Sequence, residues 1–156
     1  MDYDIAAQRV TGESHRRAGV ICQDAYDRSI QLGSMILVVA DGHGSKICKY
    51  SDIGAKKAVE AFIRVMEPLT MDVDGYYRFV SHNRHELLPR RVCAKWLKAV
   101  EVYHRRVHRN EKFSPRLYGT TLVGLVLTSD SYFALQIGDG DALAVSAAGE
   151  VSRITT

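Results

Sequence analysis

Apolar and polar residues alternate in blocks along the chain, and their spacing predicts several strands. Residues 35–40 (MILVVA) form a short apolar run rich in β-branched residues, which is typical of a buried strand. Two later apolar runs, residues 122–127 and 132–137, are joined by four polar residues in the pattern of a β-hairpin. Weaker strand patterns cover residues 4–10, 26–32, 142–147 and 151–154, with turn residues at 33–34 and 148–150.

Two other stretches have the 3.6-residue period of a helix. The first is predicted by apolar residues that share one helical face: Ala55, Val59, Phe62, Ile63 and Met66. Ser51 or Asp52 is expected to cap its start, and Pro68 to lie just beyond its end. The second begins at Pro89 and has its own apolar stripe, formed by Val92, Trp96, Val100, Tyr103 and Val107. Residues 71–85 are polar and predict neither helix nor strand.

The order of these elements predicts an α+β fold, because strands are followed by helices and then by consecutive antiparallel strands. The length of 156 residues fits one domain, and 46% hydrophobic with 25% charged residues excludes a disordered or disulfide-rich small protein. The longest apolar run is far shorter than the roughly 20 residues that cross a bilayer. The acidic N-terminus and three scattered cysteines indicate a cytoplasmic protein with no secretory signal.

Positive charge is concentrated in one segment. Residues 78–116 hold eleven Lys or Arg and three Glu, a net charge of +8, whereas the rest of the chain carries −5. Such a segment is typical either of nucleic-acid binding or of a solvated helix face. The second reading is favoured, because most of these cations lie off the apolar stripe of the predicted second helix.

Acidic residues next to glycines mark the candidate chemistry. Asp24 follows Gln23, residues 41–44 read DGHG, and residues 139–141 read DGD, the last two directly after apolar strands. Carboxylates and backbone carbonyls freed by glycine are the oxygen ligands that Mg²⁺ and Mn²⁺ prefer. One Asp-Gly pair alone is usually a turn, but two at strand ends favour a metal site. His43 is equally compatible with a turn residue and a general acid, because imidazole exchanges protons near neutral pH.

Four segments together resemble the successive motifs of the metal-dependent protein phosphatases, the type 2C Ser/Thr family, and its bacterial branch in particular. They are residues 12–25 (GESHRRAGVICQDA), 38–44 (VVADGHG), 119–122 (GTTL) and 137–142 (IGDGDA). The DGHG step is the most specific, and the resemblance covers nearly the whole chain. It implies a four-layer α-β-β-α sandwich of antiparallel sheets, a single type 2C-like domain over residues 1–156, and two or three Mn²⁺ or Mg²⁺ ions.

The resemblance also implies a role for individual residues. The implied metal ligands are Asp24, Asp41, the carbonyl of Gly42, and Asp139. Asp41 and His43 are the implied catalytic residues, Asp41 as the ligand between two metals and His43 as the acid that protonates the leaving group. Arg17 or Arg16 is matched to the arginine that binds the substrate phosphate, although Gly19 occupies the position where that arginine is expected.

Two departures from the family pattern affect the expected activity. Gln23 stands where some members have glutamate, and two later metal-binding aspartates of the family have no match here. Asp74-Gly75 lies in a polar connector and is no substitute. We therefore expect the chain to be the N-terminal part of the domain, completed by further C-terminal sequence or, if Thr156 is the true end, by dimerisation.

These observations predict a phosphatase that removes phosphate from serine and threonine of a phosphorylated protein substrate. We expect a cognate Ser/Thr kinase to phosphorylate that substrate, and we expect no membrane partner. The alternative is a non-catalytic type 2C-like binding or regulatory module, favoured by the missing aspartates. Nucleic-acid binding through residues 78–116 is the third and least favoured reading.

Overall fold

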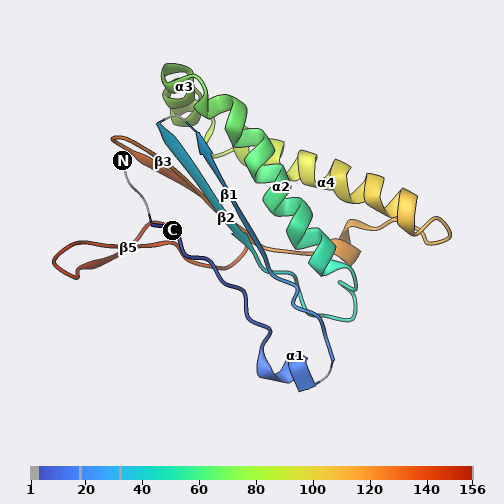
Figure 1. The fold of residues 1–156 in the computed structure, drawn as a ribbon. Coiled ribbons are helices and arrows are strands. Elements are labelled where there is room, and N and C mark those ends of the chain that lie inside the picture. Colours follow the sequence, from blue (N-terminus) through green and yellow to red (C-terminus); the bar gives the residue numbers. More distant parts are fainter. Residues whose placement is uncertain (1–3, 18, 32, 156) are drawn as a thin grey trace.

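The computed structural model describes residues 4–17, 19–31 and 33–155. Its centre is an antiparallel four-stranded sheet in the order β1-β2-β3-β4 (Figure 1). The strands are β1 (Ala25–Gln31), β2 (Ser34–Ala40), β3 (Leu122–Thr128) and β4 (Tyr132–Ile137). A second sheet pairs two short strands, β5 (Leu143–Val145) and β6 (Val151–Arg153).

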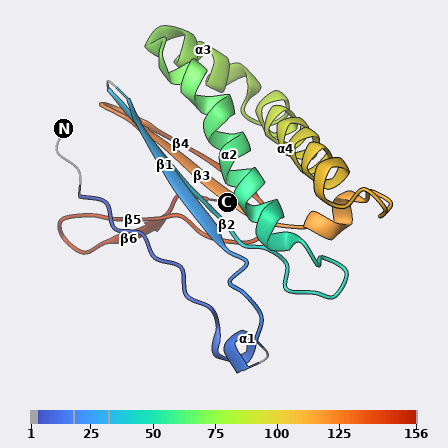
Figure 2. The same ribbon diagram turned by 45° about the vertical axis from the view of Figure 1, so that its right-hand side comes forward.

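Helices cover one face of the four-stranded sheet (Figure 2). They are α2 (Ser51–Thr70), α3 (Val73–Asn83) and α4 (Leu87–Val107), while α1 (Glu13–Arg17) lies near the N-terminus and the short 3₁₀ helix η1 (Pro115–Tyr118) precedes β3. The α+β class with antiparallel sheets is therefore confirmed. Within the described residues, no helix is long and apolar enough to cross a membrane.

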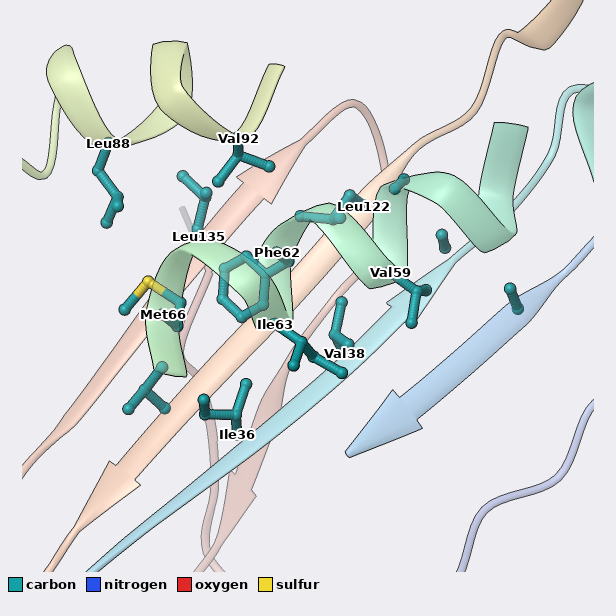
Figure 3. Packing of buried hydrophobic residues seen from close by; sticks show 14 of the residues in the cluster. Ile36, Val38, Val59, Phe62, Ile63, Met66, Leu88, Val92, Leu122 and Leu135 are labelled. Carbon is teal, nitrogen blue, oxygen red and sulfur yellow. The ribbon is translucent and has the colours of Figure 1, made fainter. Parts of the chain in front are cut away.

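The core lies between α2 and the central strands, where buried side chains interdigitate (Figure 3). Phe62 is fully buried, and its ring occupies the space above Gly124, where a β-carbon would lie 2.3 Å from the ring. On the far side of α2, Leu88 and Val92 of α4 pack toward Leu135 of β4. The glycine in β3 thus lets the helix approach the sheet closely, which fixes the position of α2 relative to β2.

The opposite face of the same sheet is also apolar and is exposed in part, although Met35 and Val123 on this face are buried. Val39 alternates with the buried Val38 and is 52% exposed, and Tyr26, Ile30 and Tyr132 are also exposed. Apolar residues on both faces are typical of strands that are covered on both sides. The described residues show one helical layer on one four-stranded sheet, so the four-layer sandwich stays a prediction.

Several predicted elements need correction. Residues 4–10 form no strand, because this extended segment pairs with no neighbouring strand. The first long helix continues through Pro68 to Thr70, whose hydroxyl donates to the carbonyl oxygen of Glu67 and stabilises the last turn. Neither Ser51 nor Asp52 is its N-cap, which is Tyr50. Most of the polar stretch 71–85 is helical, since Asp72 caps the start of α3 by accepting from the amide of Gly75.

The remaining elements match their predictions. The strand at 35–40, the hairpin at 122–137 and the two short C-terminal strands all form. The second helix starts at Leu87, two residues before Pro89, and buries Val92 and Val100.

Candidate metal site at the end of the sheet

The loop that follows β2 is held in place by the chain that precedes β3. Gly42 and Thr120 form an isolated antiparallel bridge beyond the end of the sheet. The amide of Thr121 donates to the carbonyl oxygen of Asp41 at 2.8 Å, and the amide of His43 donates to the carbonyl oxygen of Gly119 at 3.0 Å. The backbone on both sides of Gly42 is therefore fixed by residues about 80 positions later in the sequence.

Two threonine hydroxyls add to this anchoring of Asp41. The amide of Asp41 donates to Oγ1 of Thr121 at 3.2 Å, and Oγ1 of Thr120 donates to the carbonyl oxygen of Asp41 at 2.8 Å. The amide and the carbonyl of Asp41 are thus satisfied, so its carboxylate is not needed to hold the backbone. The GTT segment, which resembled a family motif, is the structural support of the aspartate.

Gly42 occupies a position where no side chain fits. A β-carbon there would lie 2.7 Å from the carbonyl oxygens of both Gln23 and Ser51. In an antiparallel pair whose hydrogen bonds are made by the flanking residues, the peptide groups of the central residue point away from the partner strand. The carbonyl of Gly42 is therefore directed away from Thr120, and its role as a metal ligand stays a prediction.

The supporting segment is anchored in turn by a buried tyrosine. Tyr118 is fully buried, and its hydroxyl pairs with Nδ1 of His104 at 2.9 Å. Burial raises the pKa of Tyr118 to about 12, so this hydroxyl stays protonated. Nε2 of His104 lies 2.9 Å from the carbonyl oxygen of Glu111. Periodicity had not pointed to His104 or Tyr118, because their contacts join α4 to a loop rather than to a regular element.

Asp24, Asp41 and Asp139 line one cavity of about 340 Å³ at this end of the sheet. Partial burial raises the pKa of Asp41, as do a side-chain hydrogen bond to Asp24 and the negative charges of Asp24 and Asp139. The charge of His43 acts in the opposite direction and lowers the pKa of Asp41. The structure therefore brings together the three aspartates that the sequence singled out, while His43 acts on Asp41 through its charge and does not line the cavity.

The donor set matches a hard cation that keeps part of its water shell. Oε1 of Gln23 is buried and has no hydrogen-bond partner among the described residues, but Gln23 does not line the cavity. Across those residues, no group of three or more His, Cys, Asp or Glu side chains is arranged to hold an ion. Mg²⁺ is often bound by one or two carboxylates and several waters, which fits Asp24 and Asp41.

The two candidate phosphate-binding arginines lie apart from the cavity. Arg16 and Arg17 are exposed on α1, and both form ion pairs with Glu13. Arg9 lines the cavity instead, and its Nη1 donates to the carbonyl oxygen of Asp24 at 3.2 Å. Sequence analysis missed Arg9 because the strand predicted over residues 4–10 gave it no role. The roles of Arg16 and Arg17 stay predictions.

Comparison with known proteins adds one finding. A family model described as protein phosphatase 2C matches residues 11–156, which include every residue predicted for the site. No curated protein and no solved structure shows a match to the chain.

Proposed function

The chain belongs to the protein phosphatase 2C family, and from that premise we propose that it is a metal-dependent phosphatase acting on phosphoserine and phosphothreonine in proteins. The family supports hydrolase chemistry of the phosphatase type. The observation that carries the finer proposal is the convergence of Asp24, Asp41 and Asp139 on one cavity, where burial and their mutual charge raise the pKa of Asp41. We propose further that residues 1–156 belong to a single domain of this type.

The proposed cofactor is Mn²⁺ or Mg²⁺, which when bound supplies Lewis-acid activation of water and neutralises charge on the phosphate. Asp24, Asp41 and the carbonyl of Gly42 would hold it, with Asp139 as a further carboxylate. Asp41 suits this role because its backbone is held by three hydrogen bonds, two through its carbonyl oxygen and one through its amide, and the amide of the nearby His43 is held as well. A fixed carboxylate loses little conformational freedom when it takes up a cation.

His43 is proposed to donate a proton to the oxygen of the departing serine or threonine. The side chain of His43 is exposed, so a substrate can reach the ring. Its backbone amide donates to the carbonyl oxygen of Gly119, which fixes the backbone from which the side chain extends. Stabilising the leaving alkoxide in this way is the usual task of a positioned general acid. Arg16 or Arg17 would bind the substrate phosphate, with a phosphorylated protein as the partner and a Ser/Thr kinase supplying it.

A non-catalytic type 2C-like module is the second candidate function. It is favoured by one observation: among the described residues, no group of three or more metal-ligating side chains is arranged to hold an ion. This reading predicts a folded protein with weak or absent Mn²⁺ binding.

Phosphate release decides between the two functions. The full chain is incubated with p-nitrophenyl phosphate or a phosphothreonine peptide, with Mn²⁺ or with EDTA. The proposal expects turnover that requires Mn²⁺ and is lost in Asp41→Asn. Asp74→Asn is the matched control, since it changes an Asp-Gly pair on α3 far from the cavity. No metal-dependent turnover, or unchanged turnover in Asp41→Asn, would refute the catalytic proposal.

A further inference from the structure

A groove of about 860 Å³ runs between α2 and α4, on the outer side of the helical layer. The two helices lie side by side over the sheet (Figures 1 and 2). Val59, Ile63 and Met66 of α2 face the core, while the polar groove-lining residues of α2 lie on the other side of the helix and Val65 and Leu69 lie between the groove and the core. Each helix contributes one stripe with spacings of four, three and four: residues 57, 61, 64 and 68 of α2, and residues 91, 95, 98 and 102 of α4.

The floor of the groove is apolar. Ala61, Val65 and Leu69 line it from α2, and Ala94, Ala99 and Val102 line it from α4. Ala61 is buried, whereas Val102 is 55% exposed. The small alanines leave room between the helices, and the larger side chains offer apolar surface to whatever lies in that room. Burial of such surface is favourable roughly in proportion to its area.

The rim of the groove is strongly basic. Lys57, Arg64, Arg91, Lys95 and Lys98 border it, with Glu60 as the single acid. Nζ of Lys57 lies 2.9 Å from Oε2 of Glu60, so these two charges compensate each other. Arg91 lies over the ring of Phe79 at 4.8 Å, which holds its charge near one end of the groove. Arg64, Lys95 and Lys98 form no ion pair within the described part of the chain.

We propose that this groove binds an acidic amphipathic helix of a partner protein. A helix with apolar residues at i, i+3, i+4 and i+7 would place them on the floor, and its flanking carboxylates would meet the cations on both rims. Residues 91–102 of α4 span about 16 Å, which corresponds to about three turns of such a helix. The proposal concerns the outer face of the helices and is independent of phosphatase activity.

The apolar floor distinguishes this partner from nucleic acid. A phosphate backbone needs cations but gains nothing from the strip of Ala61, Val65 and Ala94 that separates the two rims. An amphipathic helix uses both features at once. Its binding therefore depends on the order of its residues, whereas binding of a polyanion depends on charge alone.

Fluorescence anisotropy with labelled probes tests this inference on the full chain. The first probe is a capped peptide of about 14 residues made of Leu, Ala and Glu in the amphipathic order. The second is a scrambled peptide of the same composition, and the third is an oligothymidylate of equal charge. We expect the amphipathic peptide to bind at about 50 mM salt, more tightly than the other two probes.

Three variants locate the binding. Lys95→Glu/Lys98→Glu reverses two rim charges and should weaken binding about tenfold. Arg106→Glu/Arg109→Glu makes the same charge change outside the groove and should have a much smaller effect. Ala94→Lys adds a cation but fills the floor, so it should weaken peptide binding, whereas attraction by charge alone would strengthen it. Circular dichroism confirms that each variant is folded.

The inference is overturned by any of three results. They are no binding of the amphipathic peptide up to about 1 mM, equal binding of the scrambled peptide or the oligothymidylate, and equal losses in the groove variant and in the Arg106→Glu/Arg109→Glu control. Stronger peptide binding by Ala94→Lys would also contradict a shaped groove.

Discussion

The two acidic glycine loops that line the candidate metal cavity are built in different ways. The loop at 41–44 follows β2 and is tied by backbone and threonine hydrogen bonds to residues 119–121. The loop at 138–141 follows β4, is exposed, and turns through Gly138 at φ +87° and Gly140 at φ +124°. The first loop is held by contacts with residues about 80 positions later in the chain, whereas the second relies on glycine conformations that other residues rarely adopt and on the nearby ion pair of Asp141 with Arg153.

This difference indicates a division of labour within the proposed site. Asp41 is exposed, but partial desolvation, the hydrogen bond to Asp24 and the charges of Asp24 and Asp139 raise the pKa of its carboxyl, so the fold holds this carboxylate where its charge is costly. Asp139 is also exposed, in a loop that leads to the short strands β5 and β6. We expect Asp41 to be essential for catalysis and Asp139 to adjust metal affinity. The predictions below test this contrast, from the largest expected effect to the smallest.

The largest effect is expected from removing each carboxylate in turn. Asp41→Asn should lower metal-dependent turnover on the order of 10³-fold, because it removes a charge that the chemistry uses directly. Asp139→Asn should weaken apparent Mn²⁺ affinity by about tenfold to a hundredfold and largely spare turnover at saturating metal. Steady-state kinetics over a series of Mn²⁺ concentrations measures both. Equal losses of turnover at saturating Mn²⁺ would break the contrast between the two loops.

A substitution at Gly42 should have the next largest effect. In Gly42→Ala the new β-carbon would lie 2.7 Å from two backbone carbonyl oxygens, so the loop must move. We expect a loss of about 2 kcal/mol in the free energy of unfolding, together with a marked loss of turnover. Gly12→Ala is the control, since a β-carbon there meets nothing within 4 Å. Urea denaturation measures the stability, and a fully stable Gly42→Ala variant would show that the loop is not tightly held.

Loss of one anchoring hydroxyl should have a smaller effect. Thr121→Val keeps the shape of the side chain but removes the Oγ1 that accepts from the amide of Asp41. We expect a loss of about 1 kcal/mol in stability and a lower turnover rate. Thr121→Ser retains the hydroxyl and should restore most of both. If Thr121→Ser is as impaired as Thr121→Val, the methyl group rather than the hydrogen bond is what matters.

The smallest effect is expected in the pH dependence of the metal-free protein. The pKa of Asp41 is raised in the folded state by burial, by the hydrogen bond to Asp24 and by the charges of Asp24 and Asp139. Its contribution to stability is therefore present at low pH and is lost as the pH rises through the raised pKa. With EDTA present, the melting temperature of the wild type should fall relative to Asp41→Asn across this window. If the difference in melting temperature between the two proteins stays constant as the pH changes, ionisation of Asp41 does not destabilise the folded protein.

Sequence analysis predicted the elements whose signal is local. The apolar run of β2, the hairpin of β3 and β4, and the stripe of α4 all have a clear period. The helix at 73–83 was missed because residues 71–85 were judged by their polar members, although Tyr76, Tyr77 and Val80 have helical spacing and pack into or against the core. The strand expected at 4–10 does not form, because an alternating pattern does not by itself provide a neighbouring strand to pair with.

The site was predictable only for those residues that have a local signal in the sequence. Asp24, Asp41 and Asp139 stand out by their glycine neighbours and family motifs, and they do line one cavity. The supports of Asp41 come from Thr120 and Thr121, some 80 residues away, and no local pattern encodes that contact. Arg9 reaches the cavity from a segment without regular structure, which is why its proximity was visible only in the fold.

Calorimetric titration of Mn²⁺ into the full chain tests the central claim most directly, namely that Asp24, Asp41 and Asp139 form a cation site. We predict saturable Mn²⁺ binding by the wild type, its loss in Asp41→Asn, and wild-type binding in Asp74→Asn. Absence of Mn²⁺ binding by the folded wild type, or undiminished binding by Asp41→Asn, would contradict the claim.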